Sequence, residues 1–204
     1  MIERLPMAAS ETPAAVPKLG RTLVLVGLMG AGKTSVGKRL AGLLGVGFVD
    51  SDAEIEEAAG MTIPEIFSTL GEPAFRDGER RVIVRLLAER PGVLATGGGS
   101  FVEGRTREEI KARATSIWLR ADVDLLYERV RDRPGRPLLQ VADPRGVLSE
   151  LSQRRAPFYS QADITVDSRR GLTHEAMARS IVEAVHAYDR TGCGGRRPTF
   201  EEPT

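Results

Sequence analysis

The stretch Gly27–Thr34, GLMGAGKT, decides how this chain folds. It follows a short apolar run, residues 23–26, and opens an amphipathic segment that ends at Leu44. A strand, a glycine-rich turn and a helix start in this order are the context in which G-x-x-x-x-G-K-[ST] forms a phosphate loop. The N–H groups of such a loop and the adjoining helix N-terminus bind anions. The motif therefore predicts a site for a nucleoside triphosphate, with Lys33 at the β- and γ-phosphates and Thr34 on Mg²⁺.

Length and composition are those of one soluble globular domain. The chain has 204 residues, of which 41% are hydrophobic and 28% charged. The formal net charge of +1 supplies no general attraction to nucleic acid or to a membrane surface. No apolar run reaches the ~18 residues of a membrane span, and residues 1–17 lack the apolar core of a signal peptide. We therefore expect a monomeric cytoplasmic protein that binds neither nucleic acid nor membrane.

Strands and helices are predicted to alternate along the chain. The expected strands are residues 22–26, 46–50, 92–96, 115–119 and 162–166, and the expected helices are 33–44, 53–59, 63–70, 72–90, 103–112, 122–131, 147–155 and 173–187. This alternation predicts an α/β fold in which helices cover both faces of a parallel sheet. We expect one domain over residues 21–189, a flexible extension at 1–20 and a disordered tail at 190–204. The polar, Pro/Gly-punctuated stretch at about 133–144 is typical of a mobile lid.

A phosphate loop does not by itself say what happens to the triphosphate. Three classes are open: a small-molecule kinase, a GTPase-type switch and a nucleic-acid-directed ATPase. The switch needs a base-reading motif such as N-K-x-D, which the sequence lacks, and a motor ATPase usually needs a longer chain. These features favour a small kinase.

Six motifs in order then make the chain resemble the shikimate kinase family, whose members are P-loop kinases similar to the nucleoside-monophosphate kinases. They are GLMGAGKT (27–34), FVDSD (48–52), GEPAFR (71–76), TGGG (96–99), RPLL (136–139) and RRAPFY (154–159). The resemblance runs from Arg21 to Ala187. It implies the three-layer P-loop kinase fold, a five-stranded parallel sheet of order 2-3-1-4-5, and a lid. It also implies that ATP, with Mg²⁺, phosphorylates the 3-hydroxyl of shikimate in aromatic amino acid biosynthesis.

The resemblance assigns the ATP side of the site. Its ATP-binding residues are Gly30, Ala31, Gly32, Lys33, Thr34, Ser35, Arg129 and Arg136. Arg129 matches a position near the adenine, and Arg136 matches the lid arginine that reaches the phosphates. The family pattern implies that Asp50 and Thr34 hold Mg²⁺. From the residues alone, Asp50 could equally be a helix N-cap.

The same resemblance assigns the acceptor side. It places Asp52 at the shikimate hydroxyls, where it could accept the proton of the attacking one, and makes Lys33, Asp52 and Arg136 the catalytic residues. Arg76 and Arg155 match the positions that bind the substrate carboxylate, to which a planar, permanently charged guanidinium is suited. Gly98 and Gly99 match the positions beneath the substrate ring. Without the motif, Arg76 would be read as a surface residue of an Arg/Glu-rich helix.

Two rival functions remain at this stage. One is another kinase of the same fold, for gluconate or a nucleotide, although such an enzyme should lack the combined acceptor motifs. The other is a non-catalytic nucleotide-binding regulator, which would be expected to have a degraded phosphate loop. His174 and His186 are expected to be structural or surface residues away from every motif, whereas Tyr159 could serve packing or the substrate region.

Overall fold

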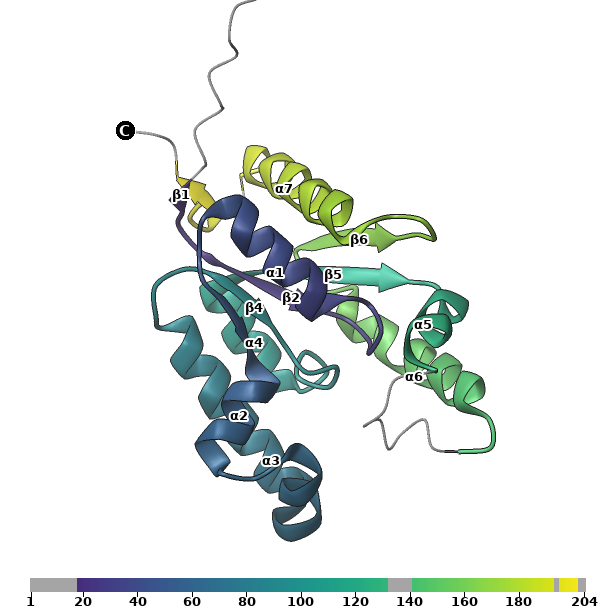
Figure 1. The fold of residues 1–204 in the computed structure, drawn as a ribbon. Coiled ribbons are helices and arrows are strands. Elements are labelled where there is room, and N and C mark those ends of the chain that lie inside the picture. The colour runs from purple at the N-terminus through teal and green to yellow at the C-terminus, as the bar shows by residue number, and fades with distance from the viewer. Residues whose placement is uncertain (1–17, 132–140, 193–194, 202–204) are drawn as a thin grey trace, which may run out of the picture.

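The computed structural model describes residues 18–131, 141–192 and 195–201, and its centre is a five-stranded parallel sheet (Figure 1). The strands are β2 (Thr22–Val26), β3 (Phe48–Asp50), β4 (Val93–Ala95), β5 (Ala114–Ala121) and β6 (Ile164–Ser168). They lie in the order β3-β4-β2-β5-β6, and every neighbouring pair is parallel. Counted along the chain, these five strands have the order 2-3-1-4-5. The predicted fold class and strand order are confirmed.

Seven helices are described around this sheet. They are α1 (Lys33–Leu44), α2 (Ser51–Ala59), α3 (Ile63–Leu87), α4 (Gly104–Arg113), α5 (Val123–Val130), α6 (Pro144–Tyr159) and α7 (His174–Arg190). Figure 1 shows α1 and α7 side by side on one face of the sheet and α4 and α6 on the other. The two helices α2 and α3 form a lobe beyond the β3 edge. In the described part of the chain, none of these helices is long and apolar enough to cross a bilayer.

The core explains why β2 occupies the centre. Residues 23–26 are completely buried, because β2 has a strand on each side and helices on both faces. A strand in this position needs apolar side chains on both of its faces, which is the continuous pattern that the sequence has. Close packing of α1 also requires a glycine, since a Cβ at Gly37 would lie 2.5 Å from the Phe48 ring.

Several predicted helix bounds differ from the structure; α2 and α6, for example, begin two and three residues earlier than predicted. The helices predicted on either side of Gly71 form the single run α3, but Gly71 itself has non-helical angles (φ 78°, ψ 170°), so the predicted break is real. The predicted end of α6 before Pro157 is wrong, because the helix continues to Tyr159. Pro157 lies in the last turn, so the backbone hydrogen bond that it cannot donate is lost only at the end of the helix.

Both ends of the described chain are more ordered than predicted. Strand β1 (Lys18–Leu19) pairs antiparallel with β7 (Phe200–Glu201). The expected flexible extension through residue 20 and the expected disorder from residue 190 are therefore wrong for residues 18–20 and 195–201. Buried apolar side chains and paired backbone groups stabilise both segments. Most of the lid predicted at about 133–144 lies outside the described residues, which omit 132–140, and Pro144 begins α6.

Candidate active site

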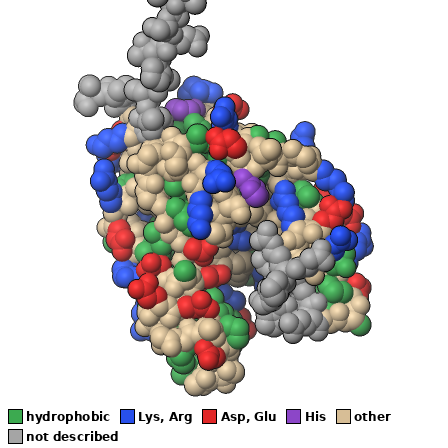
Figure 2. Space-filling model, in the orientation of Figure 1, with side chains coloured by type: hydrophobic (Ala, Val, Ile, Leu, Met, Phe, Trp, Pro, Cys, Tyr) green, Lys and Arg blue, Asp and Glu red, His purple; other side chains and the backbone are tan. Residues whose placement is uncertain are grey.

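A hollow of about 340 Å³ opens at the carboxyl edge of the sheet, where β2, β3 and β4 end. Of the residues predicted for the site, those that line it are Gly30, Gly32, Lys33, Thr34, Ser35, Asp50, Asp52, Gly98 and Arg129. Met29, Thr96, Gly97 and His174 complete its wall. Figure 2 shows this face of the molecule hollowed beside the lobe of α2 and α3, on which acidic side chains gather. Parallel strands bring motifs far apart in sequence to this one edge.

The phosphate loop requires its glycines for conformation and for space. Gly30 and Gly32 have φ angles of 81° and 96°, which L side chains rarely adopt. A Cβ at Gly30 would also lie 2.8 Å from the Val130 side chain. Gly32 is the N-cap of α1 and provides no side-chain cap, so the first N–H groups of α1 are left for a ligand. Ala31 is buried within the loop.

The ammonium group of Lys33 lies over the loop. It donates hydrogen bonds to the carbonyl oxygens of Gly27 (2.8 Å) and Leu28 (3.0 Å). These two hydrogen bonds hold the Lys33 ammonium group at the phosphate loop, which leads into the N-terminus of α1. Lys33 is therefore placed to meet a phosphate.

Asp50 joins two parts of the site. One carboxylate oxygen accepts a hydrogen bond from the Thr34 hydroxyl at 2.8 Å, and the other accepts from the backbone N–H of Asp52 at 3.2 Å. Asp50 is thus the N-cap of α2 and also a neighbour of the phosphate loop. The two roles that the sequence left open for Asp50, helix N-cap and ligand of Mg²⁺, are therefore compatible.

Asp52 lies in an environment that disfavours its charge. Its pKa is raised from 3.8 to about 6, first by burial and then by the nearby carboxylate of Asp50, while the ammonium of Lys33 opposes both effects. Asp52 also packs against the glycine run that follows β4, since a Cβ at Gly97 would lie 2.7 Å from its Oδ1. A carboxyl group that titrates near neutrality in a hollow is a candidate for proton transfer.

A buried carboxylate holds the first of the two predicted carboxylate-binding arginines. Glu79, only 1% exposed, accepts a hydrogen bond from Arg76 at 2.7 Å and another from the Ser100 hydroxyl at 2.6 Å. Burial disfavours the charged guanidinium, but the hydrogen bond and charge of Glu79 outweigh it and raise the pKa of Arg76. Neither Glu79 nor Ser100 is among the residues predicted from the sequence. The spacing of three from Arg76 to Glu79 on one helix is the signal that could have identified the pair.

The glycine run brings the second arginine to the site. Arg155 and Tyr159, both on α6, donate to the carbonyl oxygen of Gly98, the former at 3.0 Å. Burial raises the pKa of the Tyr159 phenol, and its ring packs 5.9 Å from that of Trp118. Tyr159 therefore serves both packing and the site. The next glycine is equally constrained, because a Cβ at Gly99 would lie 2.6 Å from a guanidinium nitrogen of Arg76.

Two side chains flank the other end of the phosphate loop. Arg129 on α5 donates to the carbonyl oxygen of Gly30 at 3.3 Å, and His174, the first residue of α7, lines the same hollow. The expectation that His174 lies away from every motif is therefore wrong. The sequence could not reveal this, because α7 begins far along the chain and reaches the loop only through sheet topology. Arg136 lies outside the described residues, so its role stays a prediction.

Comparison with known proteins identifies one family. The family model described as shikimate kinase matches residues 29–186. A protein named shikimate kinase from Bradyrhizobium diazoefficiens is 52% identical over 185 residues, covering 90% of this chain and 89% of that one. Another of that name, from Nitrobacter winogradskyi, is 57% identical over 162 residues, covering 79% and 76%.

Solved structures agree. The structure of shikimate kinase from Acinetobacter baumannii in complex with shikimate superposes with a TM-score of 0.78 at 40% identity, covering 82% of this chain and 93% of that one. A gluconokinase from Sinorhizobium meliloti, at 20% identity and a TM-score of 0.54, shares only the fold. The family match and the identities over most of the chain show that this protein belongs to the shikimate kinase family.

Proposed function

We propose that this protein transfers the γ-phosphoryl group of ATP to the 3-hydroxyl of shikimate, forming shikimate 3-phosphate and ADP with Mg²⁺ as cofactor. The observation that carries the proposal is that one hollow joins a phosphate loop to an acceptor side. Lys33 and Thr34 line it on the donor side, and Asp52 and Gly98 on the acceptor side. Through Gly98 and Gly99 the acceptor side continues to two arginines, which suits a substrate that is a carboxylate.

The donor side supports the binding of ATP and Mg²⁺. The uncapped N–H groups at the start of α1 and the Lys33 ammonium supply positive charge for the phosphates. The Thr34 hydroxyl and the Asp50 carboxylate, 2.8 Å apart, are hard oxygen donors, and Mg²⁺ takes only one or two such protein ligands. When bound, the metal neutralises charge on the β- and γ-phosphates. Arg129 and His174 then flank the part of the hollow left for the nucleoside.

The acceptor side supports the orientation of a small hydroxylated acid. Arg76 and Arg155, permanently charged and separately anchored, bind the shikimate carboxylate. Gly98 and Gly99 are proposed to lie beneath the ring, and side chains at these positions would also meet those same arginines. Asp52 accepts hydrogen bonds from the ring hydroxyls and fixes the attacking one.

Positioning and charge compensation carry most of a phosphoryl transfer. In the proposed reaction Lys33 compensates the charge that develops on the transferred group, while Asp52 orients the hydroxyl. With a pKa of about 6, Asp52 is largely ionised at pH 7 and can take up the hydroxyl proton as the bond to phosphorus forms. The lid residue Arg136 is proposed to reach the phosphates. We further propose that the protein acts as a cytoplasmic monomer.

A coupled assay of ADP release tests the substrate. Purified protein with ATP and Mg²⁺ is expected to turn over shikimate, and to show no turnover of gluconate or of nucleoside monophosphates above the background of ATP hydrolysis. Mass spectrometry of the product should show one added phosphoryl group on shikimate. Turnover of gluconate or of a nucleotide in preference to shikimate would refute the proposed substrate.

A further inference from the structure

The C-terminal segment 195–201 lies outside the matched family model, which ends at residue 186, yet it contributes to the core. Thr199 is fully buried and Phe200 is 7% exposed. The Phe200 ring packs 4.5 Å from that of His186 on α7, and the Thr199 hydroxyl lies 2.8 Å from that of Thr115 on β5. Such burial is typical of residues that belong to the folded domain and not of a poorly ordered terminus.

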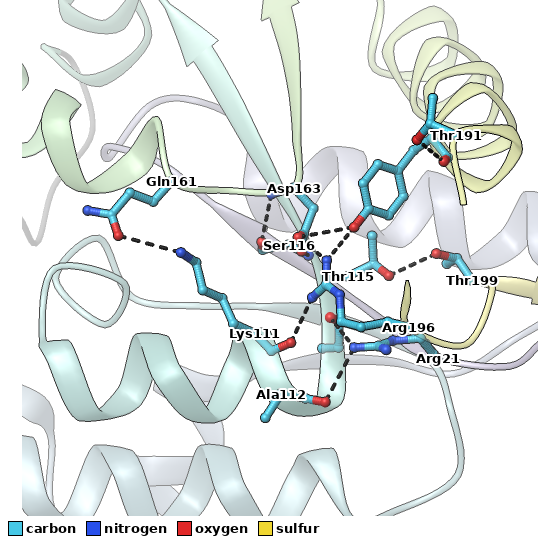
Figure 3. A network of polar contacts seen from close by, with 12 residues as sticks. Arg21, Lys111, Ala112, Thr115, Ser116, Gln161, Asp163, Thr191, Arg196 and Thr199 are labelled. Atoms are coloured by element: carbon cyan, nitrogen blue, oxygen red, sulfur yellow. Dashed lines mark hydrogen bonds and ion pairs between the residues drawn. The ribbon is translucent and has the colours of Figure 1, made fainter. Parts of the chain in front are cut away.

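Arg196 is the polar centre of this segment (Figure 3). Its guanidinium donates to the carboxylate of Asp163, just before β6, and to the phenol oxygen of Tyr188 near the end of α7. The other oxygen of Asp163 accepts from the backbone N–H of Ser116 at 2.8 Å and from its hydroxyl at 2.7 Å. One arginine of the segment thereby connects β5, β6 and α7.

The same region completes the end of α4. The last carbonyl groups of a helix lack partners within it and are favourably met by cations. Arg196 donates to the carbonyl of Lys111 at 2.7 Å (Figure 3). Arg21, from the other end of the described chain, donates to the carbonyl of Ala112 at 3.5 Å and to that of Ala114, the first residue of β5, at 2.7 Å. Two arginines from opposite ends of the sequence therefore meet at the C-terminus of α4.

Hydrogen bonds of its backbone groups hold the remaining part of the segment in place. The carboxylate of Asp189 accepts from the N–H groups of Thr199 and Phe200, both at 2.9 Å. Beyond them β7 pairs with β1, and Glu201 forms an ion pair with Lys18 at 2.8 Å. These contacts lie near the amino end of β5, opposite the edge that carries the candidate active site.

We propose that residues 195–201 form a clasp that joins β1, α4, β5 and α7 at the amino-terminal edge of the sheet. The clasp sets the temperature at which this enzyme unfolds and is inactivated, while the chemistry at the opposite edge proceeds without it. This assignment rests on the contacts of the segment and not on the proposed substrate, because its first readout is the unfolding temperature.

The first experiment compares two truncated proteins. A chain that ends at Gly192 lacks the clasp, and a control that ends at Glu201 keeps it. The shorter protein is expected to melt roughly 5–15 °C lower, since lost contacts shift Tm by about 2–4 °C per kcal/mol in a chain of this size. At a temperature where both are folded, kcat and the KM for each substrate should agree within about twofold. An unchanged Tm would overturn the proposal, and so would a loss of kcat with Tm retained.

A point substitution keeps the test decisive if the truncated chain does not fold. Arg196→Gln removes the central cation, and Arg197→Gln is its matched control, because the neighbouring Arg197 is largely exposed and pairs only at the surface with Glu201. The first variant should lower Tm and speed amide hydrogen exchange at Ser116, Thr199 and Phe200, whereas the second should do neither. Equal behaviour of the two variants would refute the clasp. Failure of the substrate assay would leave these outcomes unaffected.

Discussion

The carboxylate of Glu79 lies 2.7 Å from the guanidinium of Arg76, one turn back along α3, and both side chains are largely withdrawn from water. The second oxygen of Glu79 accepts from Ser100, which follows the glycine run. A single buried acid thus fixes the candidate substrate arginine relative to the backbone on which the substrate is proposed to lie. Arg76 is held in place before any ligand meets it.

Replacing Glu79 with glutamine should weaken the use of shikimate without removing a group that touches it. The amide keeps the shape of the side chain but loses the charge-assisted hydrogen bond to Arg76, an interaction of about 1.5–3 kcal/mol. Steady-state kinetics should show a KM for shikimate raised roughly 10- to 150-fold with a much smaller change in kcat. Asp77→Asn, at an exposed pair on the same helix, is the control. A KM within twofold of the unmodified protein would contradict the role of Glu79.

Asp52→Asn should lower the activity of the protein and raise its stability at pH 7. A carboxyl group whose pKa rises from 3.8 unfolded to about 6 folded destabilises the fold as the pH increases through that interval. The metal-free Asn variant should therefore be more stable than the unmodified protein at pH 7, by about 3 kcal/mol at most, with little difference below pH 4. Urea unfolding in the presence of a chelator measures this. The same variant should show severely reduced phosphoryl transfer, and a variant that is inactive but no more stable would argue against the burial effect.

Gly99→Ala should displace Arg76 by steric contact alone. The new methyl group would lie 2.6 Å from the guanidinium, so the arginine must move away from the glycine run. We expect a KM for shikimate raised at least tenfold, with the KM for ATP nearly unchanged. Gly42→Ala is the matched control, because nothing lies within 4 Å of its Cβ position on α1. Similar kinetics in both variants would show that the space beside Gly99 is not needed.

Lys33→Ala should leave a folded protein with very weak phosphoryl transfer. The ammonium lies over the phosphate loop, and the charge it compensates increases toward the transition state, so kcat should fall by several orders of magnitude. Lys38→Ala serves as control, since this lysine lies on the same helix over the Phe48 ring. Circular dichroism checks the fold of both proteins. Near-normal turnover by Lys33→Ala would refute its assignment.

Asp163 should make the clasp sensitive to acid. Burial would raise the pKa of this carboxyl group, but the hydrogen bonds from Ser116 and Arg196 prevail and hold it below the usual 3.8. Its stabilising effect is therefore complete above about pH 4 and is lost as the pH falls through the folded pKa. Asp163→Asn should lower Tm at pH 7, and the difference from the unmodified protein should shrink below pH 4. Asp167→Asn, at an exposed ion pair on β6, should lower Tm less at pH 7.

The sequence was most informative where local patterns and the fold agree. Strand β2 and helix α1 have the predicted bounds, because an uninterrupted apolar run and a glycine-rich turn leave few alternatives. The parallel sheet then explains why Asp50 and Gly98 meet at one edge. Contacts between distant segments were harder to predict. Ser100 becomes a partner of Glu79 only after folding, and His174 reaches the phosphate loop only through sheet order.

The C-terminal segment is a second example of structure that the local sequence pattern does not predict. A short segment rich in Gly and Arg has no hydrophobic periodicity, so nothing local predicts order in residues 195–201. Phe200 enters the core because β1, Thr115 and Asp189 provide a complementary surface. Thr115 is more than 80 positions away in the sequence. A local sequence pattern cannot indicate a contact with so distant a residue.

The antiparallel pairing of Lys18–Leu19 with Phe200–Glu201 brings together two segments from opposite ends of the described chain. Circular permutation depends on such proximity. A short linker between these two strands, with a new opening at an exposed turn such as residues 88–90 before β4, would leave the segments that line the hollow at the far edge uninterrupted. A reporter protein fused beside β1 or β7 would likewise project away from the substrates, so this edge offers a point of attachment for immobilising the enzyme.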